Sequence, residues 1–210
     1  MKVLFVVDVH TSRAALEWIG RKGKDYDAII VGGDIARSGG QDFVSEFLDA
    51  VASTGKTAFF VPGNADSSQT KVPTGVVPLH GRTATVGKHT IGGLGGSNPT
   101  PFHTIFELED ADATSILSRL GRLDILVSHC PPVNTKCDRA GGAHIGSAPV
   151  REYIIRERPY LVLSGHAHDS RGIDKVGDTT IVNPGPLMRG NYAEVRLDGL
   201  ISVELKSERL

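Results

Sequence analysis

The sequence is poor in cysteine, with only Cys130 and Cys137 among 210 residues. Two thiols make no disulfide framework and lack the partners of a structural zinc site, so we expect both to be reduced. Long apolar runs are also missing: no stretch approaches the length that spans a bilayer, and no signal-peptide segment precedes the apolar run that starts at Lys2. These absences predict a cytoplasmic protein with no membrane partner.

Charge of one sign is not in excess either. The 23 Lys and Arg residues nearly balance the 24 Asp and Glu residues, which leaves a formal net charge of -1. Sequence-independent binding to nucleic acid usually needs a clear basic excess, so nucleic acid is disfavoured as a partner. The glycine-rich stretch 92–97 lacks the GxGxxG spacing and the strand-to-helix context of a dinucleotide site, and we expect a loop there.

The first third of the chain alternates predicted strands with predicted helices. Continuous apolar runs at 2–7, 28–31 and 57–61 are typical of strands buried on both faces. Two segments with apolar residues at helical spacing separate these runs, the first capped by Thr11 or Ser12 and ended by Gly23. This order predicts a parallel sheet with right-handed crossovers.

The rest of the chain predicts further strands, two more helices and an antiparallel tail. Helices are expected before Gly121 and after Ser147, and hairpin turns at 176–178 and 198–199. No linker or repeat interrupts the chain, so we predict one domain over 1–210. Its predicted α/β fold has two mixed sheets packed face to face with helices outside. The expected strands are 82–86, 88–91, 123–127, 161–163, 171–176, 179–182, 192–197 and 200–205.

Seven side chains able to bind metal follow predicted strands directly. In open α/β sheets, ligands collect beyond the carboxyl ends of the strands. Three oxygen ligands and four imidazoles, with no thiolate, suit Mn, Fe, Zn, Co or Ni better than Ca or a structural zinc. Singly, these residues would suit a helix cap, a turn or a buried histidine, but the repeated pattern favours a two-metal centre that hydrolyses phosphate esters. The seven are Asp8, His10, Asp34, Asn64, His129, His166 and His168.

The same residues, taken in order, resemble the signature of the calcineurin-like metallophosphoesterases. The motifs are Asp8-Val9-His10, Gly33-Asp34, Gly63-Asn64, His129 and Gly165-His166-Ala167-His168. Stretches 100–102, 138–139, 144–147 and 183–185 look like the small branch related to bacterial cyclic-AMP phosphodiesterases, the Icc-related proteins.

This resemblance implies a four-layer αββα sandwich and a dinuclear centre. By the resemblance, Asp8, His10 and His168 hold one metal, Asn64, His129 and His166 hold the other, and Asp34 bridges both. We expect two divalent transition-metal ions, Mn first, with Fe, Ni, Co or Zn as alternatives. The catalytic role is assigned to Asp34, Asn64 and His129.

One position departs from the family pattern. Many members have a histidine after the Gly-Asn pair, which helps to neutralise or protonate the leaving oxygen, whereas this chain has Ala65. We therefore expect activated esters to be cleaved best, because general acid catalysis contributes typically 10²–10⁴-fold.

Four other residues are candidates for substrate contact. His103 and His144 lie in predicted loops and could donate to a phosphate or replace the absent histidine. Arg139 and Arg171 offer a bidentate fork for phosphate oxygens, although a surface ion pair explains each equally well. His80 and His89 lack such a context and are expected at the surface.

We predict a dinuclear metal-dependent phosphoesterase that acts on small phosphodiesters, and next on monoesters, through in-line attack by a metal-bridging hydroxide. A small phosphate ester is the expected partner, and a homodimer is left open. The alternatives are a phosphomonoesterase or a nuclease of the same superfamily, and a non-catalytic scaffold with the same fold.

Overall fold

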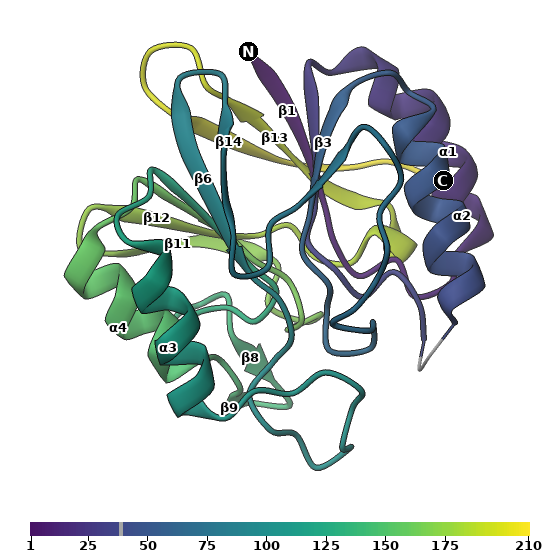
Figure 1. Cartoon of the computed structure of the whole chain (residues 1–210). Coiled ribbons are helices and arrows are strands. Elements are labelled where there is room, and N and C mark those ends of the chain that lie inside the picture. Colours follow the sequence, from purple (N-terminus) through teal and green to yellow (C-terminus); the bar gives the residue numbers. More distant parts are fainter. Residues whose placement is uncertain (38–39) are drawn as a thin grey trace.

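Two six-stranded β-sheets lie face to face in the computed structural model of the chain, which describes residues 1–37 and 40–210 (Figure 1). The first sheet contains β1 (Lys2–Val6), β2 (Ala28–Val31), β3 (Thr57–Phe60), β4 (Val76–Pro78), β13 (Asn191–Arg196) and β14 (Ser202–Ser207), in the order β14-β13-β1-β2-β3-β4. The second contains β5 (Thr83–Val86), β6 (His89–Leu94), β7 (Ile125–Ser128), β10 (Leu161–Leu163), β11 (Gly172–Val176) and β12 (Thr179–Asn183), in the order β11-β12-β10-β7-β6-β5.

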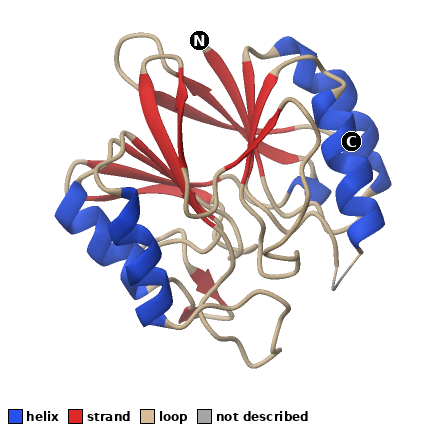
Figure 2. Cartoon of the chain, in the orientation of Figure 1, coloured by secondary structure: helices blue, strands red, loops and turns tan. Residues whose placement is uncertain are grey.

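Helices cover the outer face of each sheet, which gives four layers (Figure 2). The helices α1 (Arg13–Lys22) and α2 (Gln41–Ala52) pack on the first sheet, and α3 (Asp110–Leu120) and α4 (Ala148–Glu157) pack on the second. The predicted αββα sandwich of two mixed sheets is confirmed. Short 3-10 turns, η1 (Gly23–Asp25) and η2 (Leu187–Arg189), and a two-stranded hairpin of β8 (Arg139–Ala140) and β9 (Ala143–His144) complete the described elements.

The helix starts follow from local hydrogen bonding. Ser12 caps α1 by accepting the N–H of Ala15, and Ser147 caps α4 by accepting the N–H of Val150. Each cap satisfies one of the backbone donors left without a partner at a helix start. Among the described residues, no helix combines the length and the apolarity needed to cross a membrane.

Side chains of β1 alternate between two apolar cores. Leu4 and Val6 belong to the core between the first sheet and its helices, while Val3 and Phe5 belong to the core between the two sheets. All four are fully buried. Burial on both faces explains why this strand is a continuous apolar run and not an alternating one. A third core lies between the second sheet and its helices.

The strand directions place the carboxyl ends of the parallel strands at one end of the sandwich. In the first sheet β1, β2, β3 and β4 run parallel, and in the second β6, β7, β10 and β12 do so. Strands in antiparallel pairs flank these parallel blocks: β13 lies beside β1 and β14 beside β13, β5 lies beside β6, and β11 lies beside β12. The loops after β1, β2, β3, β7 and β10 therefore emerge together.

Some expectations from the sequence were wrong. The stretch 92–97 is not all loop, since Gly92, Gly93 and Leu94 complete β6. A side chain at Gly93 would overlap Val61 and Leu79, so this glycine allows close packing between the sheets. The short elements β4, β8 and β9 were not predicted. The single domain over 1–210 stays a prediction.

Two histidines expected at the surface are not there. His89 is only 7 % exposed, because it starts β6 on an inward-facing position, and its Nδ1 lies 3.8 Å from Asp124 Oδ2. His80 is half-buried, and its Nδ1 accepts the N–H of Gly95 at 2.9 Å. Both cysteines are free and buried, and burial raises the pKa of each thiol to about 12.

Candidate metal centre

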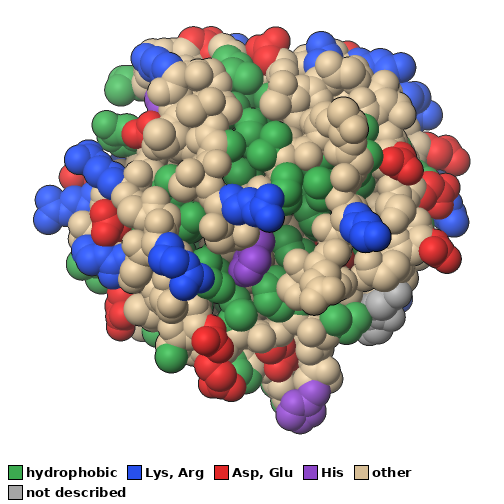
Figure 3. Space-filling model, viewed as in Figure 1, with side chains coloured by type: hydrophobic (Ala, Val, Ile, Leu, Met, Phe, Trp, Pro, Cys, Tyr) green, Lys and Arg blue, Asp and Glu red, His purple; other side chains and the backbone are tan. Residues whose placement is uncertain are grey.

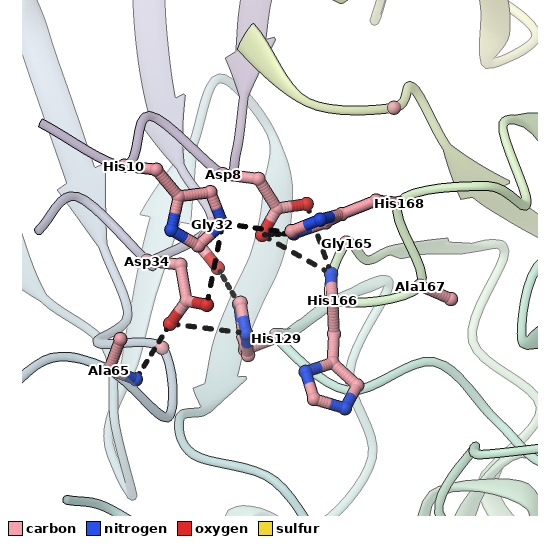
Figure 4. A network of polar contacts seen from close by, with 12 residues as sticks. Asp8, His10, Gly32, Asp34, Ala65, His129, Gly165, His166, Ala167 and His168 are labelled. Atoms are coloured by element: carbon pink, nitrogen blue, oxygen red, sulfur yellow. Dashed lines mark hydrogen bonds and ion pairs between the residues drawn. The ribbon is translucent and has the colours of Figure 1, made fainter. Parts of the chain in front are cut away.

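The loops at the carboxyl ends of five parallel strands bring all seven predicted ligand residues together. Figure 4 labels all of them except Asn64. Strands from both sheets contribute, so the site lies where the two layers meet. Asp8 and His10 follow β1, Asp34 follows β2, Asn64 follows β3, His129 follows β7, and His166 and His168 follow β10.

Four of these residues form one ligand group. One ligand atom each from Asp8, His10, Asp34 and His168 lies within 4.8 Å of the other three. The Nε2 atoms of His10 and His168 are 2.9 Å apart, and His168 Nε2 lies 3.7 Å from Asp8 Oδ1. A metal with bonds of about 2.1 Å separates neighbouring ligand atoms by roughly 3 Å, so this spacing fits one ion.

A second group lies on the other side of Asp34. Asn64 Oδ1 is 3.0 Å from His129 Nε2 and 2.8 Å from His166 Nδ1. His129 Nε2 is also 3.5 Å from Asp34 Oδ1, while Asp34 Oδ2 is 3.8 Å from His10 Nε2. The two oxygens of Asp34 thus face different ligand groups, which is the arrangement of a carboxylate shared by two ions.

His129 is oriented by a bond to the backbone. Its Nδ1 lies 2.8 Å from the carbonyl oxygen of Gly32, to which it can donate, and its Nε2 then faces Asp34 and Asn64. An imidazole held in this way presents its other nitrogen to a metal in a fixed direction. The glycine carbonyl is a part of the site that side-chain patterns do not reveal.

The buried groups shift one another's pKa values. Burial raises the pKa of Asp34, but His129 and His10 lower it more, and the result lies well below the usual range. Burial disfavours protonation of His129, yet Asp34 raises its pKa to about 9. Burial, with the charge of His129, lowers the pKa of His166 to about 4. Such crowding of shifted groups is typical of functional sites.

Four ligand residues have strained backbones. The φ angles of Asp8, His10, Asp34 and His166 are 56°, 46°, 50° and 64°, in the left-handed region that non-glycine residues rarely adopt. Each such residue costs about 1–3 kcal/mol and persists only where its surroundings hold it, most often at functional sites. Here the N–H groups of Asp8 and His10 donate to the carbonyls of Gly33 and Asp34 at 3.0 Å.

Asp66 holds two ligand loops in place, a role that was not predicted from the sequence. Its fully buried carboxylate accepts N–H groups from Ile35 and Ala36, beside Asp34, and from Gly63, beside Asn64. Burial and the charge of Asp34 raise its pKa to about 6. An Asp two residues after Asn64 was visible in the sequence, but nothing local indicated its distant partners.

Replacing Asp66 with Asn is expected to destabilise the protein by about 1–3 kcal/mol, because an amide NH₂ would face backbone N–H donors. Metal affinity should fall about 10–100-fold, as for other residues that orient ligands. Denaturant unfolding and metal titration measure the two effects. The exposed Asp178→Asn is the matched control, and equal behaviour of the two variants would contradict the role of Asp66.

Asn183 supports the loop with the last two ligands. Its Nδ2 donates to the carbonyls of Ala167 at 2.9 Å and Cys137 at 3.1 Å, and lies 3.4 Å from that of Gly165. The side chain is fully buried, so these bonds are shielded from water. This asparagine ties the His166 and His168 loop to the segment that precedes β8.

A hollow of about 460 Å³ opens over the ligand residues. Its lining includes His10, Asp34, Asn64, His166 and His168, together with Arg37, Ala65, Thr104 and Met188. Arg37, Thr104 and Met188 were not singled out from the sequence. Arg37 lies three residues after Asp34. Only this proximity in the sequence could have indicated that Arg37 lies near the site.

The described residues that line this hollow do not include any of the four predicted substrate contacts, which are His103, Arg139, His144 and Arg171. His103 is exposed, next to Thr104, which does line it. His144 Nδ1 lies 2.7 Å from the buried Asp138, and its Nε2 lies 3.2 Å from Arg139. Arg171 donates to the carbonyl of Lys206 at 3.2 Å. Their contact with substrate stays a prediction.

One family model and one relative match most of the chain. Residues 1–204 match the family model described as the calcineurin-like phosphoesterase superfamily domain. The uncharacterized protein MJ1162 of Methanocaldococcus jannaschii is 32 % identical over 198 residues, which cover 89 % of this chain and 88 % of that protein.

Solved structures share the fold at low sequence identity. TT1561 of Thermus thermophilus has a TM-score of 0.72 and 19 % identity, with 98 % of both chains covered. A dimetal phosphatase from Danio rerio has a TM-score of 0.63 and 13 % identity, with 99 % of this chain and 96 % of that chain covered.

Proposed function

The chain belongs to the calcineurin-like phosphoesterase superfamily, and on that premise we propose that it hydrolyses small phosphodiesters with two divalent transition-metal ions. Asp8, His10 and His168 would hold one ion, Asn64, His129 and His166 the other, and Asp34 both. The observation that carries this proposal is the position of Asp34, whose two carboxylate oxygens face two separate ligand groups.

The donor set fits such ions chemically. Imidazole nitrogens with carboxylate and amide oxygens, and no thiolate, suit Mn, Fe, Zn, Co or Ni. When bound, the pair of ions supplies an activated water and polarises the phosphoryl oxygens. We propose Mn as the first choice, with Fe, Ni, Co and Zn as alternatives.

The chain's own residues would hold the centre in place and orient the substrate. Asn64 and His129 fix one side of the centre through their 3.0 Å contact, and Asp34 fixes the middle by accepting the Ala65 N–H at 2.8 Å. Arg37 and Thr104, on the wall of the hollow, are the residues in position to contact non-bridging phosphate oxygens.

Ala65 leaves the leaving group without an obvious proton donor. It lines the hollow over the ligands, where many members of the superfamily have histidine. We therefore propose that diesters with good leaving groups, such as 4-nitrophenyl diesters, are cleaved best.

Ala65→His is expected to raise kcat/KM for a diester with an alkyl leaving group by about 10²-fold, with little gain for a 4-nitrophenyl diester. The measurement is kcat/KM for a series of diesters that differ in leaving-group pKa. In Ala65→His, kcat/KM should depend less steeply on that pKa than in the wild-type protein. Ala65→Asn, which adds bulk but no general acid, is the control. A similar gain from both variants, or none from histidine, would remove support for a missing acid.

A screen after metal stripping tests the function itself. The stripped protein is supplied with Mn, Ni, Co, Zn or Fe and assayed with a diester and a monoester that share the 4-nitrophenyl leaving group. We expect metal-dependent turnover with the diester preferred. Faster monoester cleavage would make the protein a phosphomonoesterase, and no turnover with any metal would favour a non-catalytic scaffold.

A nuclease is the remaining alternative. In the face shown in Figure 3, Lys and Arg side chains are interspersed with Asp and Glu around the rim, and others lie separately near the middle, where apolar side chains gather. This face shows no continuous basic stripe of the kind that follows a nucleic-acid backbone. Degradation of single-stranded DNA with a steep salt dependence would nevertheless support a nuclease.

A further inference from the structure

The hollow over the metal ligands continues into a second hollow of about 550 Å³. His10, Arg37 and Met188 line both, so the two form one groove. The second part, which we call the distal hollow, is lined by these three residues and by Thr11, Ser12 and Arg189.

The distal hollow carries positive charge. Arg37 and Arg189 line it, and no carboxylate does so among the described residues. Arg189 forms an ion pair with Asp169, with 3.5 Å between Nη1 and Oδ1, and the two side chains are 54 % and 71 % exposed. Such an exposed pair contributes only about 0–1 kcal/mol, so Arg189 can exchange it for a phosphate at little cost.

The backbone fixes both arginines relative to the metal ligands. The N–H of Arg37 donates to Thr11 Oγ1 at 3.1 Å, one residue from His10. Arg189 ends η2, in which the N–H of Leu187 donates to the carbonyl of Val7 at 2.8 Å and that of Met188 to the carbonyl of Asp8 at 3.3 Å. Both arginine side chains therefore start from defined backbone positions next to the centre.

We propose that the distal hollow binds a second phosphate group of the substrate, with Arg189 as its main contact and Arg37 between this phosphate and the reacting one. This inference rests on the proposed function and narrows its substrate class to phosphodiesters that carry a further phosphate. Guanidinium groups bind phosphate through paired, charge-assisted hydrogen bonds, which a neutral diester substituent cannot form.

Calorimetric titration of the Mn-loaded protein tests the distal hollow with binding affinity, not turnover, as the readout. The probes are thymidine 5′-monophosphate, thymidine 3′,5′-bisphosphate and thymidine 5′-diphosphate. We expect at least one of the two probes with a second phosphate to bind about tenfold more tightly than the monophosphate. Arg189→Gln should remove this preference and change monophosphate affinity by less than twofold.

Arg13→Gln is the charge-matched control. Arg13 starts α1 directly after Ser12, pairs with Glu46 and does not line either hollow, so its loss changes the net charge equally. The preference should persist in this variant. Equal affinity of the wild-type protein for all three probes, or equal losses in the Arg13 and Arg189 variants, would overturn the proposal.

Kinetics separates this proposal from the proposed function. Thymidine 5′-(4-nitrophenyl phosphate) is compared with the same diester bearing a 3′-phosphate. The kcat/KM should be about tenfold higher for the second diester in the wild-type protein and in Arg13→Gln, but not in Arg189→Gln. A binding preference without hydrolysis of either diester would refute the proposed function and keep the phosphate site. Hydrolysis of both diesters at equal rates, without a binding preference, would support the proposed function and refute the phosphate site.

Discussion

Asp34→Asn is expected to lower the metal-dependent kcat/KM for a 4-nitrophenyl diester by about 10³-fold or more. The two oxygens of this carboxylate face both ligand groups. The amide of asparagine has no negative charge. Its oxygen could bind one ion, but its nitrogen could not bind the other. Loss of metal-derived stabilisation amounts to several kcal/mol, and about 4 kcal/mol corresponds to 10³-fold.

The fold of this variant should survive. The introduced asparagine would keep a carbonyl oxygen to accept the Ala65 N–H, and it would remove the charge that opposes ionisation of Asp66. Because this carboxylate is buried and attracts His129, its loss should lower the free energy of unfolding of the metal-free variant by no more than about 3 kcal/mol, which leaves the protein folded. Full activity in a variant with normal folding would show that Asp34 does not bridge a catalytic centre.

Gly63→Ala is expected to have the second large effect, on both stability and metal binding. A Cβ at this position would overlap Asp34 Oδ1 and the Asp34 backbone nitrogen. The N–H of Gly63 also donates to Asp66 at 2.9 Å, so the loop cannot shift freely. Overpacking of this kind costs about 1–3 kcal/mol, and the displaced carboxylate would no longer face both ligand groups.

Gly20→Ala provides the matched control for this prediction. Nothing lies within 4 Å of a Cβ built at Gly20, inside α1, so alanine there should stabilise the protein by up to about 1 kcal/mol through helix propensity. Denaturant unfolding and elemental analysis compare the two variants. Retention of two metals per chain and wild-type stability in Gly63→Ala would contradict the described contact.

Much of the centre could be predicted because its signals are local. The ligand residues follow runs of apolar residues that predict strands. Parallel strands bring the residues that follow them to one edge of the sheet. The strand bounds at 28–31 and 161–163 match β2 and β10. Whether the side chains lie close enough to share metals depends on which strands pair. Sequence patterns indicate the class of fold but not this pairing.

What could not be predicted depends on contacts between distant segments. Asp66 reads as a turn residue, and its role appears only when a loop 30 residues away supplies its N–H groups. The sequence predicts Gly93 in a glycine-rich loop, whereas the facing sheet requires a residue without a side chain there. Arg37 and Arg189 share the distal hollow only because η2 packs beside the end of β1.

Anomalous diffraction from crystals of the Mn-loaded protein tests the central claim most directly. The account predicts two peaks, about 3.5–4 Å apart, on either side of the Asp34 carboxylate. One peak should lie among Asp8, His10 and His168, and the other among Asn64, His129 and His166. Peaks elsewhere, or none at these ligands at full metal loading, would contradict it.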